Sequence, residues 1–456
     1  MILASLACTP RAIPPGGERP DVVLVSIDTL RADHLGCYGH SRDTSPFIDG
    51  LAATGTRFAH ARSPSPWTLP SHATLLSGST PLEHGVVDDG RAIPDELALI
   101  QETFRSGGFT TVGVVSTFFV SARFGFDRGF DVWEDFEVHD KKTNRQSTVD
   151  AEDVVDALMR SLPAGQEAFV FLHLYDAHYP YAAPGGYDTL FDRAATDGDL
   201  AYKQYHHYLE HPVEADQMAH QVAQYDEEIR YVDDQLRRLH ESFSAAGRPV
   251  IFVVTSDHGE EFGERGSWGH AHTLHPEQLH VPLVIHGPGV GVAVVEDVVG
   301  TQDIAATLAS LAGLERQGQV LIGEDIPARS FLSDTSRFDT NRLGIYREGA
   351  RLDWDLSSSK RTLYGDPAEL VELDDPETAA RLEAELRDRL PRTHLATGEV
   401  RTSAWTHPAS PSEGASFALL PPDAEVEGAR PLGFAERAVT LGAEEKKRLE
   451  ALGYLQ

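Results

Sequence analysis

Cysteine is scarce in this chain, which has only two, Cys8 and Cys37, among 456 residues. Two cysteines cannot form a disulfide framework or a cysteine-rich zinc site, so the count leaves oxidising and reducing compartments both open. Basic residues are also few: 39 Lys and Arg stand against 71 Asp and Glu, a formal net charge of -32. This charge argues against nucleic acid or an anionic membrane as partner. An anionic substrate would need local attraction by a metal ion or by His and Arg side chains.

Long apolar runs are absent as well, because no segment approaches the ~20 apolar residues that a membrane-spanning helix needs. The hydrophobic fraction of 41% is nevertheless that of a folded globular protein. Met1 to Cys8 is a short apolar segment with small residues before a cysteine, and a Pro- and Gly-rich stretch from Thr9 to Pro20 follows. The segment resembles a bacterial lipoprotein leader, which predicts an extracytoplasmic protein, periplasmic or secreted, with membrane contact only through a lipid on Cys8. The alternative is a disordered N-terminal tail.

Five short apolar runs rich in Val predict strands buried on both faces of a sheet. They are Asp21 to Ile27, Thr110 to Val115, Ala168 to Leu174, Pro249 to Thr255 and Val281 to Ile285. Helical patterns lie between several of them, at Leu51 to Ala53, Ala73 to Leu76, Asp95 to Phe104 and Met218 to Phe243. This alternation predicts an α/β fold with a large, mainly parallel, doubly wound sheet flanked by helices. Reactive groups in such sheets gather at the carboxyl ends of the strands.

The pattern changes after a helix-like segment at Asp303 to Leu308. Leu343 to Tyr364 alternates apolar and polar residues, which predicts a short antiparallel sheet, and an amphipathic helix follows at Pro376 to Leu390. Arg392 to Pro431 is rich in Pro, Gly and Ser, and Ala443 to Leu452 reads as a terminal helix. We therefore expect a leader and tether at 1–20, a catalytic domain at 21–315, an α+β subdomain at 316–390 and a linker with a terminal helix at 391–456.

Two acidic groups follow directly on predicted strands: Asp28 on the first, and Asp257 with His258 on a later one. A third segment, Pro66 to Gly78, predicts a turn that opens a helix, with Ser71 as the cap and Thr68 just before the helix. The free N–H groups and positive dipole end of such a helix stabilise an anion beside Thr68. Taken alone, these residues can also be ordinary helix caps.

The Pro66 to Gly78 segment resembles the signature of the sulfatases of the alkaline phosphatase superfamily. That signature runs Cys or Ser, any residue, Pro, Ser, Arg, then two residues and an apolar pair before Thr-Gly. Residues in register with it are Pro70, Ser71, Leu75, Leu76 and Gly78. Further segments resemble the family in the same order: Asp28 with Leu35 to Gly39, Leu172 to Pro180, Tyr225 to Leu236, Asp257 to Glu260, Val281 to Leu283, Asp303 to Leu308 and Asp366-Pro367. The resemblance implies the alkaline phosphatase/sulfatase-like fold and a metal held by Asp28, Thr68, Asp257 and His258.

The chain departs from working sulfatases at the position of the nucleophile. Those enzymes convert a Cys or Ser to formylglycine there, and Thr68 allows neither that oxidation nor the elimination of sulfate that depends on it. An alcohol activated by a metal ion can still attack an ester and form a covalent intermediate. The set Asp28, Thr68, Asp257 and His258 resembles the metal site of the phosphoethanolamine transferases and lipoteichoic acid synthases, which use a Thr nucleophile on phosphorus groups.

Other departures concern the metal and the histidines. The family's paired Asp-Asp is Asp28-Thr29 here, its Arg is His72 and its Lys is His270. A site of carboxylate, imidazole and hydroxyl ligands favours Zn²⁺ or Mn²⁺ over Ca²⁺. His270 also falls at the spacing where the transferases carry a histidine for a second metal, so the number of ions stays open at one or two.

Four histidines receive predicted roles from these positions. We expect His72, His178 and His270 to join Thr68 as catalytic residues, and His178, His270 and His272 to bind substrate, although a surface position is the alternative for some of them. His206, His207 and His211 lie in a segment without family counterpart, and we interpret that segment as a lid helix and not as a metal site.

The leading functional prediction is a metal-dependent ester hydrolase of the sulfatase family that acts on phosphate or phosphonate esters through Thr68. The substrate would be a small molecule or a glycan or lipid ester. Three alternatives remain: a phosphotransferase resembling the phosphoethanolamine transferases, a sulfuric ester hydrolase, and an inactive binding protein on the same fold.

Overall fold

The computed structural model describes residues 19–136, 149–192, 215–323, 325–337, 340–365 and 371–389, together with the backbone of 437–438. Several predictions concern residues outside these ranges: the leader with Cys8, the segment with His206, His207 and His211, Asp366-Pro367, the Pro-rich linker and the terminal helix. They stay predictions, as does the division of the chain into four segments.

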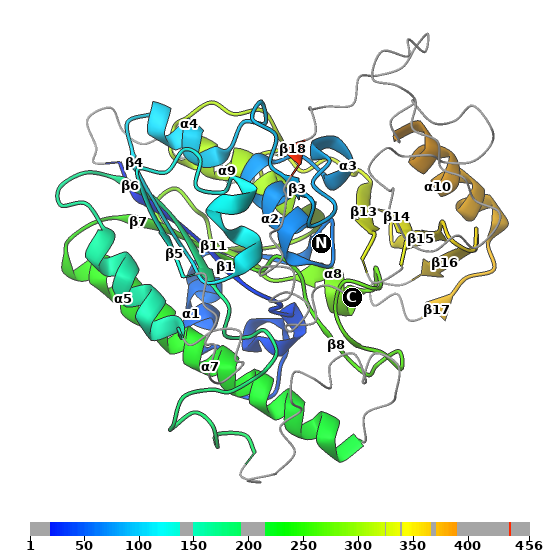
Figure 1. Cartoon of the computed structure of the whole chain (residues 1–456), viewed down its shortest axis with the longest axis horizontal. Helices are drawn as coiled ribbons and strands as arrows, with labels where there is room; N and C mark the ends of the chain where they lie inside the picture. Colours follow the sequence, from blue (N-terminus) through cyan, green and yellow to red (C-terminus); the bar gives the residue numbers. More distant parts are fainter. Residues whose placement is uncertain are drawn as a thin grey trace, which may run out of the picture.

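A nine-stranded sheet forms the centre of the molecule (Figure 1). Its strands are β1 (Asp21–Ile27), β2 (Thr56–Arg62), β4 (Thr110–Val115), β5 (Val132–Asp135), β6 (Ala168–Leu174), β7 (Val250–Thr255), β10 (His280–Val281), β11 (Leu283–His286) and β12 (Ala293–Gly300). Eight follow the order β10-β2-β11-β7-β1-β6-β4-β5, and β12 pairs with β2. From β7 to β5 all neighbours are parallel. The predicted mainly parallel sheet is therefore confirmed.

One strand of that sheet differs from the prediction. The apolar run from Val281 to Ile285 divides at Pro282, which cannot donate a ladder hydrogen bond, into β10 and β11. β11 runs antiparallel to both β7 and β2. The apolar composition marked this run as a buried strand, but composition carries no information on strand direction.

Side chains of the central strands alternate between two cores, one on each face of the sheet. Val22 and Leu24 of β1 belong to the first core, and Val23 and Val25 belong to the second. The first core is covered by α2 (Thr68–Ser77), α4 (Ile100–Ser106) and α9 (Ile304–Leu311), and the second by α1 (Pro46–Thr54), α5 (Ala151–Ser161) and α7 (Ala215–Ala245). Helices thus lie on both faces, as a doubly wound fold requires.

The predicted core stripe of α7 is confirmed, because Tyr225, Ile229, Val232 and Leu236 are at most 1% exposed. Two short helices, α3 (Pro81–His84) and α8 (Pro276–Leu279), and two small strand pairs complete the main body. The pairs are β8 (Glu261–Phe262) with β9 (Trp268–Gly269), and β3 (Arg91–Ala92) with β18 (Arg437–Ala438).

The predicted antiparallel sheet is also confirmed, with five strands in the order β13-β14-β15-β16-β17. They are β13 (Phe331–Thr335), β14 (Arg342–Arg347), β15 (Ala350–Asp355), β16 (Arg361–Gly365) and β17 (Val371–Glu372). Helix α10 (Pro376–Arg389) packs Leu382 and Leu386 against this sheet, where they meet Leu343, Ile345 and Leu352 in a separate core. The sheet lies at one side of the main body (Figure 1).

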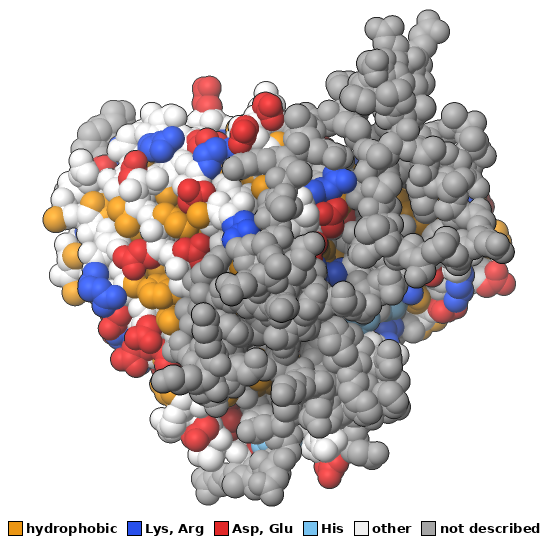
Figure 2. Space-filling view, in the orientation of Figure 1, with side chains coloured by type: hydrophobic (Ala, Val, Ile, Leu, Met, Phe, Trp, Pro, Cys, Tyr) orange, Lys and Arg blue, Asp and Glu red, His pale blue; other side chains and the backbone are white. Residues whose placement is uncertain are grey.

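Charged groups of both signs are interspersed on the face of the molecule in Figure 2, where the described residues show no large basic patch. This agrees with the acidic composition. Within the described ranges, no helix combines the length and the apolar character that a membrane crossing requires.

The loop after β1 is fixed to the second core by one tyrosine. The hydroxyl of Tyr225, on α7, accepts a hydrogen bond from the Arg31 N–H and donates one to the Thr29 carbonyl oxygen, each at 2.8 Å. This tyrosine is fully buried, so water cannot replace either bond.

We expect Tyr225→Phe to lower the free energy of unfolding by about 1–3 kcal/mol, because it leaves a buried N–H and a buried C=O unpaired. Urea denaturation of the full chain measures the change. Tyr187→Phe is the matched control: its hydroxyl donates to Asp234 at 3.0 Å in a partly exposed position, and its loss should cost less than about 0.5 kcal/mol. Equal effects of the two variants would contradict the anchoring role.

Candidate metal centre and active site

Asp28 lies at the carboxyl end of β1, where its backbone N–H donates to the Leu174 carbonyl oxygen at 2.9 Å. Its side chain is fully buried, and neither carboxylate oxygen has a hydrogen-bond partner among the described residues. Thr29 follows with φ 56°, a left-handed conformation that β-branched residues rarely adopt. Its hydroxyl donates to the Ala177 carbonyl oxygen at 2.7 Å. The position next to Asp28 therefore uses its side chain to hold a loop and does not supply a second carboxylate.

Asp257 and His258 follow β7 and meet Asp28 from the neighbouring strand. Asp257 Oδ1 accepts the His258 N–H at 2.9 Å and the Thr29 N–H at 3.3 Å, whereas Oδ2 has no partner among the described residues. His258 Nδ1 lies 3.0 Å from the Gly259 carbonyl oxygen, which can only accept. The proton therefore sits on Nδ1, and Nε2 has a free lone pair. Nε2 is 3.3 Å from Asp257 Oδ2 and 3.7 Å from Asp28 Oδ1.

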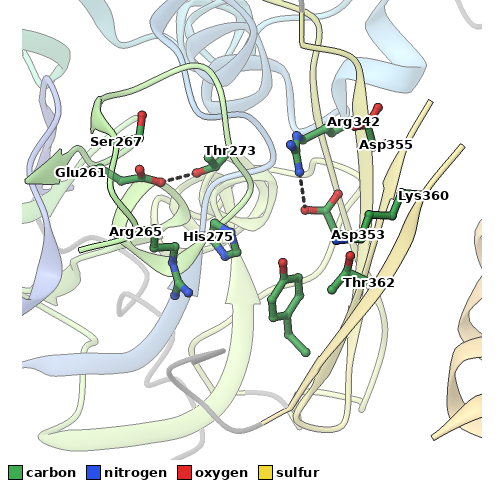
Figure 3. A pocket seen from close by; sticks show the side chains of 11 residues that line it. Glu261, Arg265, Ser267, Thr273, His275, Arg342, Asp353, Asp355, Lys360 and Thr362 are labelled. Atoms are coloured by element: carbon green, nitrogen blue, oxygen red, sulfur yellow. Dashed lines mark hydrogen bonds and ion pairs between the residues drawn. The ribbon is translucent and has the colours of Figure 1, made fainter. Parts of the chain in front are cut away.

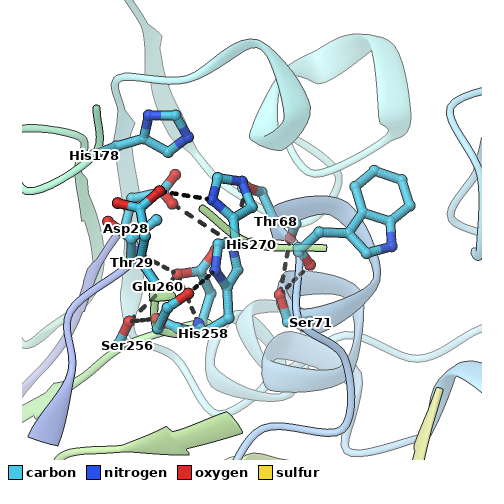
Figure 4. A network of polar contacts seen from close by, with 12 residues as sticks. Asp28, Thr29, Thr68, Ser71, His178, Ser256, His258, Glu260 and His270 are labelled. Carbon is cyan, nitrogen blue, oxygen red and sulfur yellow. Dashed lines mark hydrogen bonds and ion pairs between the residues drawn. The ribbon is translucent and has the colours of Figure 1, made fainter. Parts of the chain in front are cut away.

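This arrangement fits a divalent metal ion. One ligand atom from each of Asp28, Asp257 and His258 lies within 4.8 Å of the others, and all three side chains are buried. No described Lys or Arg side chain forms an ion pair with either carboxylate, whose ion-pair partners are all histidines. Figure 4 shows the polar contacts around Asp28 and His258. Burial raises the pKa of Asp28 to about 7 and also raises that of Asp257. Two adjacent buried carboxylates without a fixed cation need an ion to stay charged.

Thr68 brings its hydroxyl to this group from the first residue of α2. Its Oγ1 lies 3.4 Å from His258 Nε2, and the side chain is 4% exposed. No side chain caps this helix, so its first N–H groups and the positive end of its dipole face the site. An anion formed beside Thr68 is stabilised there.

The prediction that Ser71 caps α2 is wrong. The helix begins four residues earlier than a Ser71 cap requires, and Ser71 Oγ donates backwards to the carbonyl oxygens of Trp67 at 2.6 Å and Thr68 at 3.2 Å. The sequence motif identified the turn correctly, but Thr68 lies inside the helix and not before it.

His72 lies one turn after Thr68 and both its ring nitrogens contact the protein. Nδ1 donates to the Thr68 carbonyl oxygen at 2.8 Å, so Nε2 accepts from the Ser26 hydroxyl at 2.9 Å. Nδ1 is also 3.4 Å from Asp257 Oδ2. Burial lowers the pKa of this imidazole to about 3, so it is neutral. The geometry thus ties His72 to the backbone of Thr68.

His178 and His270 lie side by side, with ring centroids 5.0 Å apart, and His270 is 4.6 Å from the His258 ring. His178 Nδ1 lies 2.6 Å from the Tyr179 carbonyl oxygen, and its Nε2 is buried without a partner among the described residues. Burial lowers the pKa of His178 to about 3. The site thus contains an unprotonated imidazole nitrogen that can accept a hydrogen bond.

Sequence reasoning did not assign a role to Glu260, which orients His270. Its Oε1 lies 3.1 Å from His270 Nδ1, and its Oε2 accepts from the Tyr181 hydroxyl. Burial raises the pKa of this carboxyl. Glu260 directly follows Gly259 in the second metal segment, and that position was the available signal.

His272 does not join the other histidines. Its Nδ1 lies 2.9 Å from the His270 carbonyl oxygen, and its Nε2 faces Ser267 at 2.8 Å and Glu261 at 3.4 Å. Ala271, between the two histidines, has φ 72°, and its N–H donates to the Pro66 carbonyl oxygen. This turn directs the two imidazoles to different surroundings.

The surroundings of His272 adjoin a polar pocket of about 240 Å³, between the loop after β7 and the antiparallel sheet (Figure 3). Its lining residues are Glu261, Arg265, Ser267, Thr273, His275, Arg342, Asp353, Asp355, Lys360, Thr362 and Tyr364. Figure 3 shows Thr273 bonded to Glu261 on one wall and Arg342 paired with Asp353 on the other. Among the charged lining residues, Arg342 and Asp353 thus pair with each other.

A second group with metal-ligand chemistry, His34, His40 and Asp226, lies in the loop after β1 and on α7. Asp226 Oδ1 is 2.6 Å from His34 Nδ1, and Oδ2 is 2.9 Å from His40 Nε2 and accepts from Arg42 at 2.7 Å. Arg42 compensates the carboxylate charge here, so this group is complete without an ion, in contrast to the Asp28 group.

A mainly parallel sheet with helices on both faces thus carries a buried group of candidate metal ligands at its strand ends. A model of the Sulfatase family matches residues 20–314 of the chain. The protein therefore belongs to the sulfatase family and is a hydrolase of ester bonds. Enzymes of this family use a divalent metal ion, which agrees with the buried ligand group.

Individual relatives are distant. The chain is 26% identical over 357 residues to the uncharacterised sulfatase YidJ of Escherichia coli, covering 68% of this chain and 71% of that protein. It is 23% identical over 335 residues to the arylsulfatase of Hemicentrotus pulcherrimus, covering 65% of this chain and 58% of that protein. Among solved structures, the phosphonate monoester hydrolase of Silicibacter pomeroyi superposes with a TM-score of 0.66 at 20% identity, covering 81% of this chain and 94% of that one. At that identity the likeness shows the fold alone.

We expect the thermal unfolding temperature of the protein to fall on treatment with EDTA and to recover with Mn²⁺ or Zn²⁺. An ion at about 100 times its dissociation constant stabilises the folded state by about 2.7 kcal/mol. Asp257→Asn should abolish the recovery, and Asp226→Asn, in the second group, should keep it. Loss of the recovery in Asp226→Asn alone would place the ion at the wrong group and contradict the assignment.

Proposed function

We propose that the protein hydrolyses phosphate or phosphonate esters, with Thr68 as a covalent nucleophile. The observation that carries the proposal is the position of the Thr68 hydroxyl, at the amino end of α2 and 3.4 Å from His258 Nε2. Thr68 cannot become formylglycine, so attack by an ordinary alcohol is the chemistry open to this residue.

Asp28, Asp257, His258 and Thr68 would hold the metal ion, which supplies charge neutralisation and lowers the pKa of the alcohol. Two carboxylates, an imidazole and a hydroxyl favour Zn²⁺ or Mn²⁺ over Ca²⁺, which prefers oxygen ligands only. Phosphoryl transfer asks the protein mainly for positioning and neutralisation of charge, which a buried site of this kind provides.

The proposed reaction has two steps. In the first, Thr68 Oγ1 bonds to phosphorus while the ester P–O bond breaks, and the departing alcohol takes up the proton that Thr68 loses. In the second, a water oxygen bonds to phosphorus and the bond to Oγ1 breaks, which returns the hydroxyl of Thr68. The proton that this water loses passes to the departing Oγ1. His178 Nε2, which has no hydrogen-bond partner among the described residues, would accept a hydrogen bond from the water and orient it for attack.

The remaining histidines act around these steps. His270, oriented by Glu260, would contact the substrate oxygens or a second ion. His72 would position Thr68 through its carbonyl oxygen, since both ring nitrogens bond to the protein. His272 contacts Glu261 and Ser267, so in the proposal it orients the loop that carries His270 and does not touch the reacting group.

Structural neighbours agree with the choice of phosphorus esters and leave the alcohol part of the substrate open. Two are the phosphonate monoester hydrolases of Silicibacter pomeroyi and Agrobacterium radiobacter. Another was solved in complex with its substrate D-glucosamine-2-N,6-O-disulfate, so a glycan ester is also compatible with this fold. The proposed substrate is a small-molecule, glycan or lipid ester.

Purified protein with Mn²⁺ or Zn²⁺ should turn over at least one of aryl phosphate, bis-aryl phosphate and aryl phosphonate faster than aryl sulfate. Thr68→Ala should reduce kcat on the order of 10³-fold or more, because it removes the attacking atom. Thr74→Ala is the matched control: Thr74 is a buried threonine of the same helix that contacts His84 at 3.1 Å. It should retain kcat.

Mass spectrometry of acid-quenched enzyme should find a phosphorylated or phosphonylated Thr68. Turnover of aryl sulfate alone that survives Thr68→Ala would overturn the covalent phosphorus chemistry. Product formation only with an added sugar or lipid acceptor would instead make the protein a transferase.

A further inference from the structure

His173, which sequence reasoning passed over, is a buried histidine beside the metal ligands. It lies on β6 and pairs with Ser26 of β1 in parallel register, so the two side chains point to the same face of the sheet. Asp28 lies two residues after Ser26. The His173 side chain is fully buried, and its Nε2 is 3.3 Å from Asp28 Oδ2.

Neither ring nitrogen of His173 has a hydrogen-bond partner among the described residues. The same holds for both oxygens of Asp28, so unpaired polar groups face one another in a space without solvent. A buried donor or acceptor without a partner costs about 1–3 kcal/mol. This cost favours a state of the site in which the His173 nitrogens and the Asp28 oxygens have hydrogen-bond or metal partners.

The two carboxylates of the proposed centre differ in one respect. Asp257 has Oδ1 fixed by the N–H groups of His258 and Thr29, so Oδ2 alone is left for an ion. Among the described residues, neither oxygen of Asp28 is fixed by a hydrogen bond that meets the same distance and angle. Its Oδ1 faces His258 Nε2 at 3.7 Å, and its Oδ2 faces His173 at 3.3 Å.

We propose that His173 is a positioning residue of the metal centre: its Nε2–H donates to Asp28 Oδ2 and thereby directs Oδ1 toward the ion. The inference rests on the proposed metal site. With this hydrogen bond, Asp28 would match Asp257: the protein fixes one carboxylate oxygen, and the other oxygen is available as a metal ligand. His173 lies outside the group of ligand atoms within 4.8 Å of one another, which favours a donor to the carboxylate over a direct ligand.

The test measures the dissociation constant of Mn²⁺ on the full chain, from the electron paramagnetic resonance signal of the free ion. His173→Leu should weaken binding by about 10–100-fold, the usual effect of removing a partner of a metal ligand. His173→Gln, which carries an N–H donor at a similar distance from the backbone, should stay within about threefold of the wild type. In the leucine variant, the Mn²⁺ affinity should stay weakened at every pH between 7 and 8.

The matched control is His84→Leu. His84 is buried to the same degree, and its ring contacts the Thr74 hydroxyl at 3.1 Å and accepts the Val86 N–H at 3.0 Å, away from the metal ligands. It should lose stability and keep the Mn²⁺ affinity. If circular dichroism shows that His173→Leu is unfolded, His173→Phe, which keeps a planar ring without a donor, takes its place.

Two results would overturn the proposal. One is an unchanged Mn²⁺ affinity in His173→Leu, while the wild type binds the ion. The other is a shift of the visible absorption bands of the Co²⁺-loaded protein in His173→Gln, which would make His173 a direct ligand. A wild type that binds neither Mn²⁺ nor Zn²⁺ would instead overturn the metal site itself, so the two failures are distinguishable.

Discussion

The site depends on two negative charges placed together where water is excluded. Asp28 and Asp257 come from neighbouring parallel strands, and both side chains are at most 1% exposed. Such a pair is unfavourable unless a cation joins it, and burial already shifts the pKa of Asp28 to about 7. The hydroxyl of Thr68 lies 3.4 Å from His258 Nε2 beside this pair, and the His258 N–H donates to Asp257.

Neutral groups surround these charges where a lysine or arginine would be expected. His72 and His173 are fully buried, and burial lowers their pKa values to about 3 and about 4. A fixed guanidinium at either position would compete with the ion for the carboxylates. In the proposed reaction, neutral imidazoles would orient the ligands and leave the charge to the metal, which suits a threonine that the metal must activate.

Much of this could be read from the sequence, and the limits have physical reasons. Unbroken apolar runs mark strands buried on both faces, so the sequence predicts the bounds of β1, β4 and β6 to the residue. The acidic residues just after two of the predicted strands point to Asp28 and Asp257. The Thr68 segment was recognisable by resemblance. The contacts that depend on how α2 packs on the sheet could not be predicted from the sequence. No pattern shows that Ser26 faces His72, or that His173 faces Asp28 and His72.

The left-handed turn at Thr29 links two parts of the active site mechanically. Its hydroxyl is bonded to the carbonyl oxygen of Ala177, in the loop that carries His178, and its N–H is bonded to Asp257. Thr29 therefore joins the loop after β1 by hydrogen bonds to both the loop after β6 and the segment after β7. A displacement of His178 by an entering ester would be transmitted through Thr29 to the carboxylates on either side of it.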